Sequence, residues 1–238
     1  MLSNYDEFAA VYNRHWGGDS LNWFPEVDRL VLDHLHPHSN VLDVCCGTGQ
    51  VAEKLTRQGF RTVGVDASLG MLRHAAVNAP GCRFVCADVR RFGLSRKFDA
   101  AISLFDSLNH LLTLEDFESA LLNVARCLAS GGVFAFDLNT EIKYLTSWSG
   151  TWTVDDPGTT MEVTTTYRED TRLAEFHATI PSRDRGRPVE VRLFQTWYSV
   201  STVVQALERS RFTDISCIAL GRNRRVEETN RVLFVARK

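Results

Sequence analysis

The chain of 238 residues lacks a long apolar segment, and none of its apolar runs approaches the roughly 20 residues of a membrane span. Its first residues, Met1-Leu-Ser-Asn-Tyr-Asp-Glu7, also lack the basic start and the apolar core of a signal peptide. We therefore expect a cytoplasmic protein that has no membrane partner.

An excess of charge of one sign is also missing. The chain carries 27 Lys and Arg against 29 Asp and Glu, a formal net charge of −2. A balanced chain gives no electrostatic case for nucleic acid as an obligatory partner. A local run of arginines, formed by Arg183, Arg185 and Arg187, is interpreted as a solvated hairpin tip. The expected partner is a small molecule, and the chain is expected to be a monomer or a homodimer.

Cysteine pairs at metal-binding spacing are absent as well. No two of the six cysteines form a C-x-x-C pair, and Cys82 and Cys86 have no second pair to complete a zinc site. His34, His36 and His38 alternate across a helix end and a proline, so they are not expected to converge. We expect no metal and reduced thiols.

What the chain does contain is a regular alternation of apolar strands and amphipathic helices. Strands are expected at 41–44, 61–65, 83–87, 98–104 and 133–136, with helices between them at 51–58, 68–78 and 113–128 and another before the first strand at 21–35. Ser68 and Thr113 are expected to cap two of these helices, and Gly131-Gly132 is expected to end the last of them. Such alternation predicts a parallel sheet that is covered by helices on both faces. Right-handed crossovers then bring the carboxyl ends of the strands to one edge, which is where a site is expected.

The pattern changes to period two from about residue 151. Alternation from Met161 to Tyr167, and again in the two following stretches, predicts an antiparallel meander inserted after the fifth strand. A helix capped by Ser199 or Ser201 and two strands at 214–220 and 231–236 follow, the last expected as an antiparallel edge. The expected parts are an N-terminal lid helix (1–20), a core (21–142), an inserted β lid (143–198) and a C-terminal segment that completes the core sheet (199–238).

A glycine-bearing turn joins the first strand to the next helix in Asp43-Val-Cys-Cys-Gly-Thr-Gly49. Backbone N–H groups at such a helix N-terminus can hold an anionic or polar small molecule. Asp66 ends the second strand and Asp88 follows the third. In this order the residues resemble the motifs of class I S-adenosylmethionine-dependent methyltransferases, whose first motif is D-x-G-x-G-x-G. Cys45 stands in place of the first glycine, and a slightly tighter cleft is expected.

The resemblance implies an α/β fold: a doubly wound, Rossmann-like, seven-stranded, mostly parallel sheet with an inserted antiparallel β-sheet. It also implies S-adenosylmethionine as cofactor. In that family the residue matching Asp43 supports the loop amides and reaches the methionine ammonium directly or through water. The residues matching Asp66 and Asp88 serve the ribose hydroxyls and the adenine amino group. The full implied set of cofactor-binding residues is Tyr12, Asp43, Cys45, Gly47, Gly49, Asp66, Ala67, Met71, Asp88, Val89 and Leu104.

The turn at 43–49 has two alternative interpretations: binding of a nicotinamide dinucleotide and nucleophilic catalysis by a cysteine. Gly47-x-Gly49-x-x-Ala52 also satisfies the dinucleotide pattern of nicotinamide dehydrogenases, with Asp66 at a suitable distance for a ribose. The order of the acidic residues over three strand ends favours S-adenosylmethionine. A nucleophilic role for Cys45 or Cys46 would need a histidine–aspartate pair, and none lies nearby in sequence.

The fourth strand leads into Leu104-Phe-Asp-Ser-Leu-Asn-His-Leu111. This loop is similar to that of small-molecule methyltransferases with a β-rich insertion, including amine and aminosugar N-methyltransferases. The resemblance implies catalytic roles for His110, Asp106 and Tyr12, although His110 could instead only cap the next helix or orient a neighbour. Acceptor contacts are expected from the lid and the strand ends, at Tyr5, Trp16, Asn109, Asn139, Arg192 and Trp197.

The expected reaction is methyl transfer to a small-molecule acceptor at nitrogen, by in-line displacement in an enclosed pocket. The sulfonium is already an activated methyl donor, so placement and exclusion of water provide most of the catalysis. O-methylation of a small phenol or acid differs only in the pocket and remains open. So does a non-catalytic, cofactor-binding regulatory protein.

Overall fold

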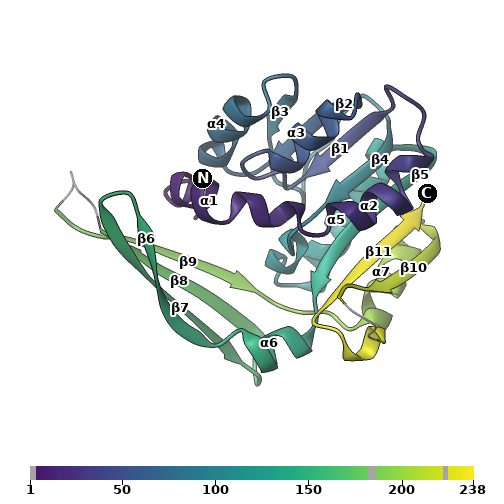
Figure 1. Ribbon diagram of the computed structural model, residues 1–238. Coiled ribbons are helices and arrows are strands. Elements are labelled where there is room, and N and C mark those ends of the chain that lie inside the picture. Colours follow the sequence, from purple (N-terminus) through teal and green to yellow (C-terminus); the bar gives the residue numbers. More distant parts are fainter. Residues whose placement is uncertain (1–3, 182–185, 222–224) are drawn as a thin grey trace.

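The computed structural model describes residues 4–181, 186–221 and 225–238, which form two sheets and their covering helices (Figure 1). The larger sheet has the order β10-β11-β5-β4-β1-β2-β3. Its strands are β1 (Asn40–Val44), β2 (Arg61–Asp66), β3 (Arg83–Cys86), β4 (Phe98–Ser103), β5 (Leu128–Asn139), β10 (Thr213–Ala219) and β11 (Arg231–Arg237). All strand pairs from β5 to β3 are parallel, and the expected fold class is confirmed.

Helices cover both faces of this sheet because its central strands are apolar on both sides. On one face α2 (Phe24–Leu30) and α3 (Gln50–Arg57) bury Val27 and Leu55. On the other face α5 (Leu114–Cys127) and α7 (Val200–Arg209) bury Phe117 and Leu207. The core therefore forms two layers, one on each side of the sheet, and leaves the carboxyl ends of the strands as the open edge.

Three helices begin where side-chain caps were expected. Ser68 accepts a hydrogen bond from the Met71 N–H at the start of α4 (Leu69–Asn78). Thr113 does the same for α5, and Ser199, one of the two candidates, does so for α7. A capping hydroxyl satisfies one of the N–H groups that the first helical turn leaves without a partner.

Several expectations about the chain are wrong. The pair Gly131-Gly132 was expected to end a helix, but β5 begins at Leu128 and runs through it. The last strand, β11, was expected at the edge, but it pairs antiparallel with both β5 and β10, so β10 is the edge. The helix expected at 21–35 is only the two turns of α2, flanked by 3-10 turns at Gly17–Leu21 and Leu32–His34. The arginines at 183 and 185 lie outside the described residues.

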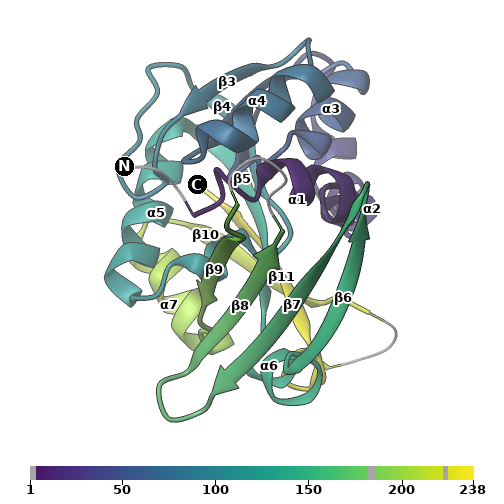
Figure 2. The ribbon, with the colours of Figure 1, turned by 90° about the vertical axis from the view of Figure 1, so that its left-hand side faces the viewer.

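The inserted region has two more elements than the period-two pattern predicted. A helix, α6 (Glu141–Ser147), precedes the sheet, and a fourth strand, β6 (Gly150–Asp156), is added to its edge. The sheet is antiparallel throughout, with β7 (Thr159–Arg168), β8 (Leu173–Ile180) and β9 (Val189–Gln195). It stands apart from the larger sheet and faces the viewer in Figure 2.

The N-terminal helix α1 (Ala9–His15) fills the space between the two parts. Phe8 and Val11 pack on the lid sheet through Met161, Val163 and Val191. On its other side this segment reaches α4, because Asp6 accepts hydrogen bonds from the Ser68 hydroxyl (2.7 Å) and the Gly70 N–H (2.8 Å). No helix in the described part of the chain is long and apolar enough to cross a membrane.

Candidate active site

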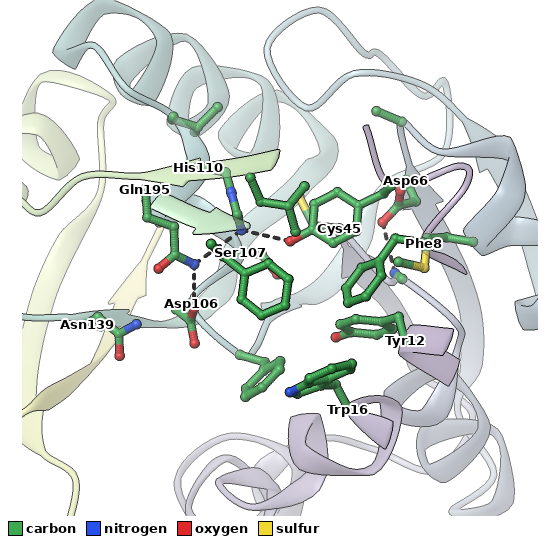
Figure 3. A pocket seen from close by; sticks show the side chains of 18 of the residues that line it. Phe8, Tyr12, Trp16, Cys45, Asp66, Asp106, Ser107, His110, Asn139 and Gln195 are labelled. Carbon is green, nitrogen blue, oxygen red and sulfur yellow. Dashed lines mark hydrogen bonds between the residues drawn. The ribbon is translucent and has the colours of Figure 1, made fainter. Parts of the chain in front are cut away.

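A cavity of about 570 Å³ lies between the carboxyl ends of the core strands, α1 and the inner face of the lid sheet (Figure 3). This size is within the usual range for pockets that hold a small molecule. Its wall is aromatic where α1 and the lid meet, with Tyr5, Phe8, Tyr12, Trp16 and Phe176, and polar at the strand ends.

The turn after β1 takes an unusual backbone course. Cys45, Gly47 and Gly49 all have positive φ, at 57°, 52° and 86°. A Cβ atom on Gly49 would lie 2.9 Å from the Cα of Ala75 in α4, so only glycine fits there. Cys45 adopts the left-handed region at a cost of about 1 kcal/mol, which explains why the family has glycine at this position. Cys45 lines the cavity, and Gly49 lies behind the wall.

Asp66 ties this turn to the next one. Its Oδ2 accepts from the Gly47 N–H (2.9 Å) and its Oδ1 from the Ser68 N–H (2.8 Å). Burial raises the pKa of Asp66, and these backbone N–H groups oppose the shift. Each carboxylate oxygen has a further lone pair, so a vicinal diol at this point in the cavity could donate to both oxygens.

Asp88 lies farther along the same edge and is held by Arg90. The Arg90 Nε and Nη2 atoms lie 3.0 and 2.6 Å from the Asp88 Oδ1 and Oδ2, and Nη1 reaches Asp116. The side-chain hydrogen bond from Arg90 lowers the pKa of Asp88. Asp88 is therefore an ionised acceptor beside Met71 and Val89, which also line the cavity.

Asp43 is buried and does not line the cavity. Burial raises its pKa well above the usual range, and the backbone N–H of Ala52 in α3 opposes that shift. Two roles were expected for Asp43: support of the turn and contact with the methionine ammonium. The structure is consistent with the first, through the start of α3. A direct contact with a ligand would have to cross the wall.

His110 faces the cavity at its other end. Its Nδ1 lies 2.7 Å from the carbonyl oxygen of Phe194 and must donate to it, because a carbonyl only accepts. Its Nε2 therefore accepts, from the Tyr5 hydroxyl at 2.9 Å and from the Gln195 amide at 3.2 Å. Burial lowers the pKa of His110, although Asp106 opposes the shift. The ring is thus neutral, with its Nε2 lone pair directed into the cavity.

A buried ionic cluster supports this end of the cavity. Arg231, at the start of β11, pairs with Asp106 after β4 (2.5 Å) and with Asp137 in β5. Asp137 also accepts from the backbone N–H groups of Phe105 (2.7 Å) and Asp106 (3.1 Å). Those two residues have positive φ, so Asp137 fixes a strained turn.

Thirteen of the expected site residues come together on the cavity wall. They are Tyr5, Tyr12, Trp16, Cys45, Gly47, Asp66, Ala67, Met71, Asp88, Val89, Asp106, His110 and Asn139. Leu104 is buried beneath the wall, and the neighbouring Phe105 lines it instead.

Three expected acceptor contacts do not line the cavity. Asn109 is fully buried and its side chain bonds the backbone of Asn139 and Thr196, so it joins the core to the lid. Arg192 is exposed and pairs with Glu175. Trp197 donates to the Tyr167 hydroxyl (2.8 Å) outside the cavity. We assign none of the three an acceptor contact.

Sequence reasoning missed Arg231, Arg90 and Tyr144. Arg231 is a lone basic residue before an apolar strand, and its partners Asp106 and Asp137 lie 125 and 94 residues away. Tyr144 lies on the unexpected α6 and donates to Gln195 (3.0 Å). Within the described residues no group of side chains could hold a metal ion, and all six cysteines are free.

Replacing Gly70 with alanine should loosen the N-terminal segment that closes the cavity. A Cβ atom there would lie 2.6 Å from the carbonyl oxygen of Asp6, next to Tyr5. Overpacking costs about 1–3 kcal/mol, so amide exchange over α1 should become about tenfold faster or more. Gly93→Ala, which meets nothing within 4 Å, is the matched control. Equal exchange in both variants would show that this contact does not hold the segment.

Comparisons with known proteins agree with this geometry. A family model described as a methyltransferase domain matches residues 41–132. The dTDP-3-amino-3,6-dideoxy-alpha-D-glucopyranose N,N-dimethyltransferase of Streptomyces fradiae is 32% identical over 192 residues, 76% of this chain and 73% of the relative. The dTDP-3-amino-3,4,6-trideoxy-alpha-D-glucopyranose N,N-dimethyltransferase of Streptomyces venezuelae is 35% identical over 130 residues, 53% of this chain and 55% of the relative.

Solved structures extend the likeness over the whole fold. An S-adenosylmethionine-dependent methyltransferase from Clostridium acetobutylicum superposes with a TM-score of 0.80 at 22% identity, covering 99% of both chains. Streptomyces venezuelae DesVI gives 0.75 at 25% identity, covering 99% of this chain and 98% of that one. In sequence, the chain spans about half the length of the first curated relatives it matches. The turn after β1, the aspartates at successive strand ends and these matches exclude the dehydrogenase alternative: the chain belongs to the S-adenosylmethionine-dependent methyltransferases.

Proposed function

We propose that this chain transfers a methyl group from S-adenosylmethionine to an amino nitrogen of a small molecule of the amino-sugar type. The observation that carries the proposal is the neutral His110, whose Nε2 lone pair faces the same cavity that residues of the cofactor motifs line. The amino-sugar class is suggested by the names of the relatives from Streptomyces fradiae and Streptomyces venezuelae.

The residues at one end of the cavity fit the cofactor. Asp66 offers two oxygens to the ribose hydroxyls, and Met71, Asp88 and Val89 provide an apolar face and an acceptor for the adenine. Gly47 and Cys45 then face the methionine part. When bound, S-adenosylmethionine supplies a methyl group that is already activated by its positive sulfur.

The residues at the other end would orient the acceptor. Tyr5 and Gln195 donate to His110 Nε2, and an acceptor N–H could replace the Tyr5 hydroxyl there. His110 would then hold the nitrogen lone pair toward the methyl group and take the proton that the nitrogen loses. Tyr12 and Trp16 cover the space between with aromatic faces that favour a cation.

We propose that the parts of the chain divide the work as the sequence suggests. Residues 1–20 and 143–198 act as the lid over a core at 21–142, which 199–238 completes. We propose a cytoplasmic enzyme with no nucleic-acid partner that works as a monomer or a homodimer. The free thiols are consistent with a reducing compartment.

Mass spectrometry with S-adenosylmethionine and a panel of amino sugars, simple amines, phenols and carboxylic acids tests this function. We expect methylated products from amino compounds only, one methyl group at a time. His110→Gln should lower the rate by about 100-fold, and His36→Gln, at an exposed position, should not. Methylation of phenols or acids alone would favour O-methylation. Cofactor binding with no product from any class would favour a regulatory protein.

A further inference from the structure

The charges around Arg231 do not cancel. One guanidinium faces two carboxylates, those of Asp106 and Asp137, and all three side chains are largely removed from water. If both carboxylates are ionised the cluster carries one net negative charge. Where that charge lies decides what kind of group the cavity favours.

Asp137 uses its carboxylate within the fold. It has no exposed surface and binds Arg231 together with the backbone N–H groups of Phe105 and Asp106. Burial raises the pKa of Asp137, but Arg231 and the backbone N–H of Asp106 oppose the shift, and both of its oxygens accept hydrogen bonds as an ionised carboxylate does. Asp137 therefore acts as the internal anchor of the turn and does not face a ligand.

Asp106 differs from Asp137 because it lines the cavity (Figure 3). Burial alone would raise its pKa, but Arg231 and the hydrogen bond from Gln195 outweigh burial, and the pKa is lowered. The carboxylate is thus ionised at neutral pH, and each of its oxygens keeps a lone pair that the protein does not use. The unbalanced negative charge of the cluster lies on the cavity wall.

Gln195 fixes where that charge points. Its Nε2 donates to Asp106 Oδ2 (2.6 Å) and to His110 Nε2 (3.2 Å), and its Oε1 accepts from Tyr144 (3.0 Å). This single amide, at the end of lid strand β9, holds the carboxylate beside the imidazole that faces the acceptor. The other cation on this part of the wall, Lys143, is only half-buried and also lines a second, more open pocket of about 490 Å³. Solvent therefore screens Lys143 more than Asp106.

We infer that Asp106 is a catalytic residue that stabilises the positive charge arriving on the acceptor nitrogen, and that it thereby selects amines over carboxylates and phenolates. In the transfer the nitrogen lone pair forms the new C–N bond while the S–C bond breaks and leaves its electron pair on sulfur. One positive charge thus passes from sulfur to nitrogen, and the nitrogen then releases a proton to His110 or water. A fixed anion on the acceptor side favours that movement of charge and repels an anionic nucleophile.

Arg231, Asp137 and Gln195 are positioning residues in this scheme. Arg231 keeps Asp106 ionised, Asp137 holds the backbone of the turn, and Gln195 aims the carboxylate. The inference rests on the proposed function, since it needs the sulfur end of the cofactor to face Asp106.

Sinefungin tests the inference without knowledge of the acceptor, because it carries an ammonium group where S-adenosylmethionine carries the methyl group. Calorimetry would compare its dissociation constant with that of neutral S-adenosylhomocysteine in wild type, Asp106→Asn and Asp28→Asn. Asp28 lies on α2, where it bonds the exposed side chain of Gln58. We expect wild type and Asp28→Asn to bind sinefungin more tightly than S-adenosylhomocysteine. We expect Asp106→Asn to lose about fivefold or more of that preference while its affinity for S-adenosylhomocysteine changes less than twofold.

An unchanged ratio of the two dissociation constants in Asp106→Asn would overturn the inference alone. Binding of neither ligand to wild type would overturn the proposed function and, with it, the inference. If Asp106→Asn does not fold, the triple variant Asp106→Asn/Asp137→Asn/Arg231→Met gives the same readout, because it leaves no unpaired charge in the cluster. The same loss of sinefungin preference is expected there, and its absence counts against the inference equally.

Discussion

Replacing Asp66 with alanine should weaken the binding of S-adenosylmethionine and S-adenosylhomocysteine by about 100-fold or more. The change removes the proposed acceptor for both ribose hydroxyls, and hydrogen bonds to a charged group are worth about 1.5–3 kcal/mol each. Two such bonds amount to about 3 kcal/mol or more, and each 1.4 kcal/mol is about tenfold in affinity. The substitution also releases the Gly47 and Ser68 N–H groups that shape the two turns. Titration calorimetry measures both dissociation constants.

Asp33→Ala is the matched control for this result, since Asp33 is an exposed aspartate in the 3-10 turn after α2. We expect its affinities to stay within twofold of wild type. Thermal unfolding of both variants separates loss of binding from loss of the fold. A folded Asp66→Ala protein that binds either ligand within a few-fold of wild type would show that the ribose lies elsewhere.

Replacing Arg231 with methionine should lower the free energy of unfolding by about 3–5 kcal/mol, because it leaves two buried carboxylates without their cation. The side chain of Arg231 is 12% exposed, and those of Asp106 and Asp137 are 11% and 0% exposed. Few solvent molecules can take over the role of the guanidinium. Denaturant titration of wild type and variant gives the difference.

The control for Arg231→Met is a surface ion pair between an arginine and a carboxylate. Arg209 pairs with Glu118 on the outside of α7, with half of its side chain exposed. Arg209→Met should cost less than about 1 kcal/mol. Adding Asp106→Asn and Asp137→Asn to Arg231→Met should recover most of the lost stability, because no unpaired charge then remains. Equal losses in Arg231→Met and Arg209→Met would contradict the view that the cluster is a buried ionic unit.

The end of the cavity that we propose for the cofactor could be predicted from sequence because its residues follow local rules. Asp66 ends β2, Asp88 follows the end of β3, and Asp43 lies one residue before the end of β1. Parallel topology brings these strand ends to one edge. Gly47 and Gly49 have positive φ, which favours glycine, and the Gly-Thr-Gly pattern indicates such a turn. The alternation of strands and helices, together with the helix caps at Ser68 and Thr113, was sufficient to predict the order in which the core elements follow one another along the chain.

The acceptor end could not be predicted in the same way because its contacts are non-local. Tyr5 meets His110 across 105 residues, and Gln195 meets Asp106 across 89. A polar residue in a loop, such as Asn109, has the same appearance in sequence whether it faces a ligand or bonds a backbone. The course of β5 through Gly131-Gly132 was missed because strand pairing overrode a local helix-stop signal.

A crystal structure with S-adenosylhomocysteine tests the central claim most directly. We expect the ribose hydroxyls on Asp66, the adenine beside Met71 and Val89, and the sulfur directed toward the space between Asp106 and His110. A ligand whose sulfur faces away from these two residues, or whose ribose does not contact Asp66, would contradict both the assigned cofactor site and the direction of methyl transfer.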